Sequence, residues 1–187
     1  GENSGTAEIT NISGGTLPYS TNWFGVDTTS LSVGTYSYLV SDNNGCVDSG
    51  SVFIDEPAVL IATDSSTNVS CNGGNDGGAT VYISGGTQTY ILNAFGYSVP
   101  LLGATSYTTP VGVGAGNYPY FVSDGNSCST SVNNILIGEP NPLNVITTST
   151  NASCFGGNDG TAEITNISGG TLPYSTNWFG VDTTSLS

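Results

Sequence analysis

Residues 34–46 read GTYSYLVSDNNGC, and residues 116–128 repeat the pattern as GNYPYFVSDGNSC. In the first copy Tyr36, Tyr38 and Val40 alternate with other residues. This period of two is that of a β-strand with one buried face. The Asp-Asn-Asn-Gly sequence that follows tolerates positive φ, which predicts a tight hairpin into the next strand. We therefore expect an all-β fold.

Other landmarks recur at a longer spacing. Residues 5–32 return without a change as residues 160–187, and shorter motifs are shared by Ile12–Thr16 and Ile83–Thr87, by 56–57 and 139–140, and by 70–71 and 153–154. Short strands with Gly and Asn turns are typical of immunoglobulin-like sandwiches. We therefore expect tandem immunoglobulin-like β-sandwich modules in a head-to-tail array. Tyr36 lies where such domains carry a tyrosine corner, and a packed core tyrosine is the alternative.

The recurrences place three modules on the chain. Residues 1–56 form an Ig-like module that lacks its first strand, residues 57–139 form a module with a loop insertion near 99–114, and residues 140–187 form the N-terminal part of a further Ig-like module that repeats 5–32. We expect the incomplete modules to be completed by more of the same repeat, along a longer chain or from a neighbouring subunit. The strand within 5–32 has one residue more than its counterpart, which predicts a β-bulge.

The charge of the chain excludes several classes of partner. The chain has 14 acidic residues and no Lys, Arg or His, which gives a net charge of −14. Ion pairs within the chain cannot stabilise the fold, so burial of apolar surface must do so, and ten Tyr and six Phe suffice for small cores. A negative surface repels nucleic acid and anionic headgroups, and no apolar run is long enough for membrane insertion.

A set of ordered motifs resembles a known family. The motifs are 154–160 (CFGGNDG), 168–174 (SGGTLPY), Trp178, 34–36 (GTY), 42–46 (DNNGC) and 56–57 (EP). Together they resemble the SprB-type repeat of large gliding-motility surface adhesins, which are exported by type IX secretion. The resemblance implies a structural or adhesive segment of an extracellular filament or giant cell-surface adhesin. Such a segment gives reach and surface contact, and its partners are other copies of the repeat and surfaces or polysaccharides.

No catalytic site is expected. Without His or Lys, acid–base chemistry would fall to carboxylates, and the adjacent Asp55 and Glu56 would point to opposite faces of a strand. We therefore do not expect an enzyme. The alternative function is a set of carbohydrate-binding modules in a secreted polysaccharide-degrading system, with Trp23 and Trp178 as stacking platforms. A Trp on the third strand of a sandwich is more often part of the core, and we favour that interpretation.

Four aspartates are the candidate metal ligands. Asp76 and Asp159 lie in the loop before the second strand, and Asp42 and Asp124 lie in the last hairpin. Head-to-tail stacking would bring these loops together at each junction, where calcium would offset their repulsion. The alternative is that Asn-Asp-Gly and Asp-Asn-Asn-Gly are ordinary turn sequences. No other cofactor is expected.

The cysteines point to an extracellular location. Four cysteines and the absence of Lys suit an oxidising compartment; the four are Cys46, Cys71, Cys128 and Cys154. The first loop and the last hairpin lie at opposite ends of a module, about 20–30 Å apart, which is too far for a disulfide. We therefore favour structural disulfides between modules over pairing within one, and free cysteines are the alternative.

Several short motifs predict glycosylation. The Asn-x-Ser sequons begin at Asn11, Asn68, Asn151 and Asn166. Thr28 and Thr183 lie in sequences that resemble the Asp-Ser/Thr-x acceptor that gliding bacteria O-glycosylate. A composition rich in Asn, Ser and Thr also produces such matches by chance.

Overall fold

The computed structural model describes residues 3–110 and 112–178. All twelve regular elements in these ranges are β-strands, which confirms the all-β prediction. None of the described residues forms a helix long and apolar enough to cross a membrane. The chain divides between Ala58 and Val59 into two compact units, so residues 57–139 and 140–187 largely share one unit.

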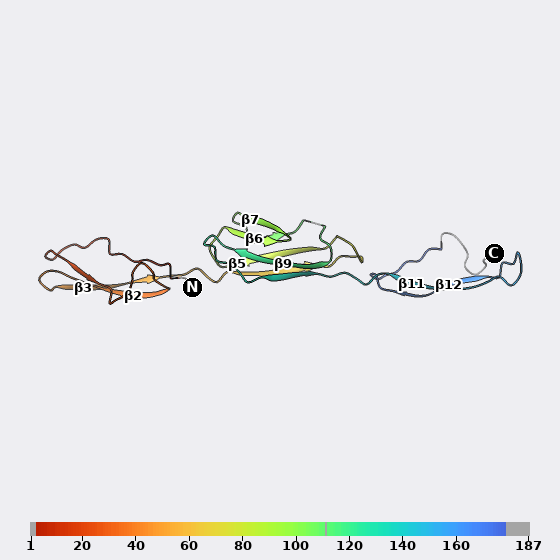
Figure 1. Cartoon of the computed structure of the whole chain (residues 1–187), viewed down its shortest axis with the longest axis horizontal. Coiled ribbons are helices and arrows are strands. Elements are labelled where there is room, and N and C mark those ends of the chain that lie inside the picture. The colour runs from red at the N-terminus through yellow and green to blue at the C-terminus, as the bar shows by residue number, and fades with distance from the viewer. Residues whose placement is uncertain (1–2, 111, 179–187) are drawn as a thin grey trace. The chain divides into compact units, whose positions relative to one another are not determined.

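A seven-stranded sandwich occupies the first part of the second unit. Its strands are β4 (Ile61–Thr67), β5 (Gly78–Ser84), β6 (Tyr90–Ala94), β7 (Tyr97–Leu101), β8 (Ser106–Thr108), β9 (Gly116–Ser123) and β10 (Asn133–Ile137). They form two antiparallel sheets, ordered β4-β5-β8 and β10-β9-β6-β7 (Figure 1). With β4 as strand A and β10 as strand G, this is an immunoglobulin-like order.

The core of the sandwich consists of alternate residues from both sheets. On β5, Val81 and Ile83 are buried, and on β9, Tyr120 and Val122 are no more than 1% exposed. The full burial of one such side chain contributes about 1.5–3 kcal/mol. Apolar burial therefore stabilises this domain in a chain that has no basic side chain to form ion pairs.

A two-stranded hairpin follows the sandwich in the second unit. It pairs β11 (Asn144–Thr150) with β12 (Thr161–Ser168), and all seven residues of β11 are exposed (Figure 1). Ile146 lies opposite Asn166 and Thr147 lies opposite Ile164, so one residue of β12 has no partner. This irregularity confirms the β-bulge, because β12 has the same sequence as residues 6–13.

The first unit contains one three-stranded antiparallel sheet. Its order is β1 (Ser20–Asn22), β2 (Gly34–Ser41) and β3 (Val47–Ile54). Gly5 and Leu31 exchange two backbone hydrogen bonds, as Gly77 and Val113 do in the second unit. Residues 6–13 therefore take the place that β5 has in the sandwich. Among the described residues of this unit, no strand pairs with them as β4 pairs with β5.

Both units contain a tyrosine corner, which was one of the two interpretations that the sequence allowed for Tyr36. The Tyr36 hydroxyl donates a hydrogen bond to the Ser32 carbonyl, and the Tyr118 hydroxyl donates one to the Gly114 carbonyl, each at 3.0 Å. Each bond reaches four residues back along the chain, to the segment that enters the strand. In the sandwich, it fixes the path by which the chain crosses between the two sheets.

One local expectation needs correction, and the two hairpins differ in one residue. Residues 99–114 are not simply a loop, because they contain the end of β7 and all of β8, which pairs with β5. In the second hairpin the residue with positive φ is Ser127 (φ 66°), at the position that Gly45 (φ 81°) takes in the first. The nearby glycine, Gly125, is not the residue that adopts this conformation.

Candidate functional site

A repeated clasp, which we call the turn clasp, holds the end of each module's second strand. The sequence Gly-Gly-Thr-x-x-Tyr occurs at residues 14–19, 85–90 and 169–174. In each copy the tyrosine hydroxyl donates to the carbonyl of the first glycine, at 2.6, 2.8 and 2.5 Å respectively. In the sandwich, the bond thereby positions the turn after the second strand against the start of the third strand. The most regular polar motif of the repeat is bonded to its own backbone.

Asp124, one of the predicted metal ligands, completes the turn clasp in the second unit. Its carboxylate accepts backbone N–H bonds from Thr87 (2.8 Å), Asn126 (3.0 Å) and Cys128 (2.9 Å), and the residue is 7% exposed. Burial raises the pKa of this carboxyl, but the N–H groups of Thr87, Cys128 and Asn126 outweigh it, so the pKa lies below its ordinary value.

Asp42 makes the same three contacts in the first unit. It accepts N–H bonds from Thr16 (2.9 Å), Asn44 (2.9 Å) and Cys46 (2.8 Å). The Thr16 bond, followed by that of Cys46, lowers the pKa of Asp42. The hairpin aspartate is thus a backbone acceptor in both units.

Asp76 and Asp159 have a matching role in the loop between the first two strands of their modules. Asp76 accepts the backbone N–H of Ser70, and Asp159 accepts that of Ser153, both at 2.9 Å. The Ser70 hydroxyl, together with its N–H, lowers the pKa of Asp76, and Ser153 does the same for Asp159. Both carboxylates are held ionised as loop acceptors.

The four aspartates do not form a metal site within the described residues. Asp76 lies before β5, whereas Asp124 bonds to Thr87 beyond the end of β5, so the two lie at opposite ends of that strand. No group of three or more Asp, Glu, Cys or His side chains in residues 3–110 and 112–178 could hold a metal ion. Calcium between modules stays a prediction.

The loop that contains Cys71 makes contacts with the chain beyond β10. Gly73 donates its N–H to the Glu139 carboxylate at 2.7 Å, and the Asn72 side chain donates to the Pro140 carbonyl at 3.1 Å. The Thr171 hydroxyl donates to the Ser70 carbonyl at 2.8 Å. Within the second unit, the first loop of one module therefore meets the turn clasp of the next.

The cysteines are placed at the loops that the sequence predicted. Each of the four is exposed and none is in a disulfide. Cys46 and Cys128 are the hairpin residues whose N–H groups bond to Asp42 and Asp124. Disulfides between modules or between chains stay a prediction.

The predicted glycosylation sites have different surroundings. Asn11, Asn68, Asn151 and Asn166 are exposed, but the Asn68 side chain accepts the Gly138 N–H at 2.8 Å. Thr28 is half-buried, and its carbonyl accepts the Ala7 N–H at 3.0 Å. Thr183 lies outside the described residues. Modification at any of these positions stays a prediction.

The tryptophans are not open platforms. Trp23 and Trp178 are both half-buried. The Trp23 ring contacts the Tyr38 ring, with centroids 5.3 Å apart and planes tilted by 52°. The contact with Tyr38 agrees with the interpretation of Trp23 as a packing residue.

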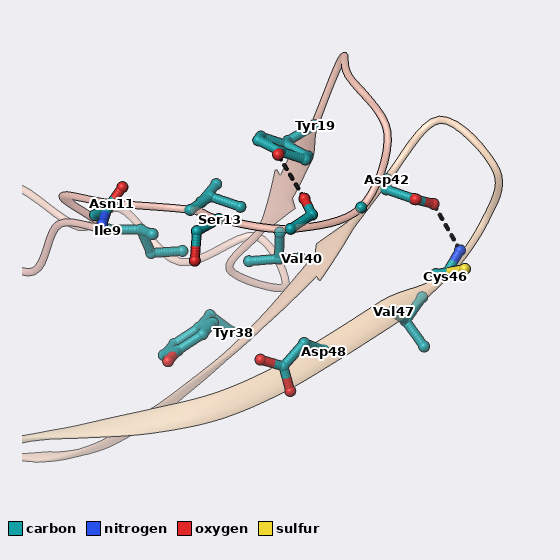
Figure 2. A pocket seen from close by; sticks show the side chains of 13 residues that line it. Ile9, Asn11, Ser13, Tyr19, Tyr38, Val40, Asp42, Cys46, Val47 and Asp48 are labelled. Atoms are coloured by element: carbon teal, nitrogen blue, oxygen red, sulfur yellow. Dashed lines mark hydrogen bonds between the residues drawn. The ribbon is translucent and has the colours of Figure 1, made fainter.

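The first unit has an open groove beside residues 6–13, which we call the first-strand groove. Its volume is about 340 Å³. In Figure 2, Ile9 and Ser13 line one side of the groove, and Tyr38 and Asp48 line the opposite side. In the second unit the positions of Tyr38 and Val40 are taken by Tyr120 and Val122, which are no more than 1% exposed. In the first unit both residues are half-buried.

Sequence reasoning missed two sets of structural residues. The first is the clasp tyrosines, which the threefold recurrence of Gly-Gly-Thr-x-x-Tyr could have revealed. The second is Leu60 and Leu143, which precede the first strands and lie close to Gly86 and Gly170 of the turn clasps. Their shared position, 83 residues apart, was the available signal.

Comparisons with known proteins show a similarity of two segments to a family of repeats. No curated protein and no solved structure matches the chain. The family model of the SprB repeat matches residues 63–91 and 146–183. Each match begins at the third residue of a module's first strand, β4 in one case and β11 in the other, and continues through the turn clasp. Two segments of the chain are therefore similar to the SprB repeat, and both matches begin at the same point of the structural module.

Proposed function

We propose that this chain is a non-catalytic segment of an extracellular repeat filament or cell-surface adhesin, and that it provides reach and surface contact. The observation that carries the proposal is the pair of SprB matches at equivalent positions of two consecutive modules. A family unit that recurs in register with the fold is typical of proteins that gain length by adding modules.

The chemistry of the motifs supports the same proposal. The hairpin and loop aspartates accept backbone N–H groups, and the clasp tyrosines donate to backbone carbonyls. These side chains stabilise the module itself, so the residues that define the repeat are structural. The net charge of −14 favours partners that are neutral or that bind through cations, such as polysaccharide surfaces and further copies of the repeat.

Electron microscopy and a bead assay test this proposal. We expect the purified chain to form fibres of uniform width, and beads coated with it to adhere to polysaccharide-coated glass more than beads coated with an unrelated protein of equal negative charge. Dispersed particles together with adhesion no greater than that of the control beads would contradict the proposal.

Three accessory features belong to the same proposal. If calcium stiffens the module junctions, a chelator should lower the unfolding temperature, and an unchanged temperature would refute calcium binding. Mass mapping without reduction would show disulfides between modules or chains. An intact mass equal to that of the bare polypeptide would exclude glycans at Thr28 and at the four asparagines.

A further inference from the structure

The outer face of the sheet β4-β5-β8 has an open groove, which we call the threonine groove. Its volume is about 280 Å³, close to the lower end of the range for small-molecule pockets, which is about 300 Å³. Hydroxyl side chains from all three strands line it, namely Ser65 and Thr67 of β4, Thr80 of β5 and Thr108 of β8. The groove lies entirely within the seven-stranded sandwich, whose core is buried.

The outward-facing residues of β5 differ from those of the corresponding strand β12 where the groove lies. The inward-facing positions of both strands have alanine followed by branched aliphatic residues. At three successive outward-facing positions the two strands differ, with Gly78, Thr80 and Tyr82 in β5 and Thr161, Glu163 and Asn166 in β12. The module with the groove has thus kept its core pattern and changed its outer surface.

The first difference opens the floor of the groove. In the hairpin the Thr161 hydroxyl lies 2.7 Å from the Thr150 hydroxyl and occupies the space between the two strands. In the sandwich this position is Gly78, and a Cβ placed there would meet the hydroxyl oxygens of Thr67 and Thr109 at 3.5 and 3.6 Å. These are ordinary contact distances, so the space would accept a side chain but contains none.

The other two differences remove a charge and add a ring. Thr80 stands where β12 has Glu163, so the middle of the groove is neutral. Tyr82 is 50% exposed and lies two residues beyond Thr80 on the same face, at a distance of about 7 Å along the strand. The insertion near 99–114 supplies β8, which forms one wall of the groove.

The polar groups of the groove can both donate and accept hydrogen bonds. The Thr80 and Thr108 hydroxyls lie 3.0 Å apart, and a hydrogen bond between them uses one of their two hydrogens. The Thr109 hydroxyl accepts the Ala79 N–H at 3.0 Å and has its own hydrogen to donate. Asp76 also lines the groove, and its carboxylate has lone pairs beyond the one that accepts the Ser70 N–H. Sugar hydroxyls, which donate and accept as well, match this set.

We propose that the threonine groove and the Tyr82 ring bind a neutral polysaccharide, with a sugar unit in the groove and the face of a neighbouring unit against the ring. The apolar C–H face of a sugar packs on an exposed aromatic ring, while its hydroxyls bond to the groove. The inference rests on the proposed contact with polysaccharide surfaces. It adds the site and the class of polysaccharide.

Charge selects a neutral polysaccharide over an anionic one. Asp76 lines the groove, and hydrogen bonds from Ser70 hold its pKa below the ordinary value, so it is ionised at neutral pH. The chain has no Lys, Arg or His that could pair with a carboxylate or sulfate group of a ligand. A uronic acid or a sulfated sugar in the groove would therefore meet repulsion with no compensating cation.

Titration of the isotope-labelled full-length chain with oligosaccharides, followed by NMR, tests the proposal. The probes are three neutral oligosaccharides, cellohexaose, laminarihexaose and mannohexaose, and hexagalacturonate is the anionic control of equal length. We expect at least one neutral probe to shift the backbone amides of Gly78, Thr80 and Thr108. Hexagalacturonate should bind at least about tenfold more weakly than that probe.

Four variants locate the site. Gly78→Thr and Thr80→Glu introduce the residues that β12 carries at these positions, and Tyr82→Ala removes the ring. Each should weaken binding of the neutral probe by about tenfold or more. Tyr97→Ala is the matched control, because Tyr97 is 74% exposed and does not line the groove. It should bind as the unmodified chain does, and urea unfolding midpoints would verify that all four variants fold.

Three results would overturn the proposal. They are the absence of amide shifts in the groove with all three neutral probes, equal affinity of the groove variants and the unmodified chain, and binding of hexagalacturonate as tight as that of the neutral probes. The bead assay separates this site from the proposed function. Beads coated with Gly78→Thr that adhere as well as beads coated with the unmodified chain would refute the groove as the contact site and leave the proposed function intact.

Discussion

Replacing Asp124 with alanine should destabilise the seven-stranded sandwich more than any other single carboxylate substitution in the chain. The change removes the acceptor of three backbone N–H groups, those of Thr87, Asn126 and Cys128, at a site that is 7% exposed. A hydrogen bond to a charged group contributes about 1.5–3 kcal/mol, but the three share one carboxylate and water enters part of the vacated space. We therefore expect a loss of about 3–5 kcal/mol in the free energy of unfolding.

Hydrogen–deuterium exchange of β9, followed by mass spectrometry, measures this loss in the sandwich alone. Both tryptophans lie outside the sandwich, so their fluorescence would not report on it. A loss of 3 kcal/mol should speed exchange by more than about 100-fold under conditions where exchange follows global opening.

Two matched variants make the prediction specific. Asp124→Asn keeps one oxygen that can accept the Asn126 and Cys128 N–H groups, so its loss in free energy of unfolding should be about half that of Asp124→Ala. Asp42→Ala removes the same three contacts in the first unit and should leave exchange of β9 unchanged. An Asp124→Ala chain whose β9 exchange stays within about fivefold of the unmodified chain would refute the reasoning.

Three further predictions concern the same domain. Tyr118→Phe removes the tyrosine-corner bond to Gly114 and should lower the free energy of unfolding, measured in urea, by about 1 kcal/mol. An unchanged urea midpoint would show that the bond does not contribute to stability. Gly86→Ala places a Cβ 2.8 Å from the Asp124 carboxylate at a residue with φ 63°, and it should lower the free energy of unfolding clearly more than Gly96→Ala. Gly96 also has positive φ (78°), but a Cβ there meets no atom within 4 Å. Equal unfolding midpoints for the two variants would show that the close contact at Gly86 does not affect stability. The lowered pKa of Asp124 stabilises the fold above the unfolded-state value of about 3.9, and this contribution is lost as the pH falls through the lower folded-state pKa. Unfolding temperatures below about pH 4 should therefore fall more for the unmodified chain than for Asp124→Ala, and parallel curves would argue against the linkage.

Features set by neighbouring residues were predictable from the chain alone. The alternation of Tyr36, Tyr38 and Val40 predicted β2, and Asp-Asn-Asn-Gly predicted the hairpin into β3. The single extra residue in the repeated strand predicted the bulge now seen in β12. Each of these features depends on side-chain direction or backbone freedom over a few residues, which the local sequence controls.

Features that depend on residues far away in the sequence were harder to predict from the sequence alone. Residues 106–108 form a strand because β5, more than twenty residues earlier, offers its free edge. Sequence could place Asp124 in a turn, but the role of its carboxylate depends on Thr87, which is 37 residues away. A pattern of turn acids is compatible with calcium binding and with backbone capping, and only the fold determines which N–H groups are within reach.

The residue pattern was sufficient to establish the repeat, the all-β class and a surface chemistry without cations, since these follow from composition and short periods. The tertiary structure decided which edges are covered. It showed that residues 6–13 lie beside an open groove while the identical residues 161–168 pair with β11. The two copies differ because β11 lies just before residues 161–168, whereas among the described residues no strand pairs with residues 6–13 in that way. A strand's sequence does not specify its partner, because the pairing depends on a second segment.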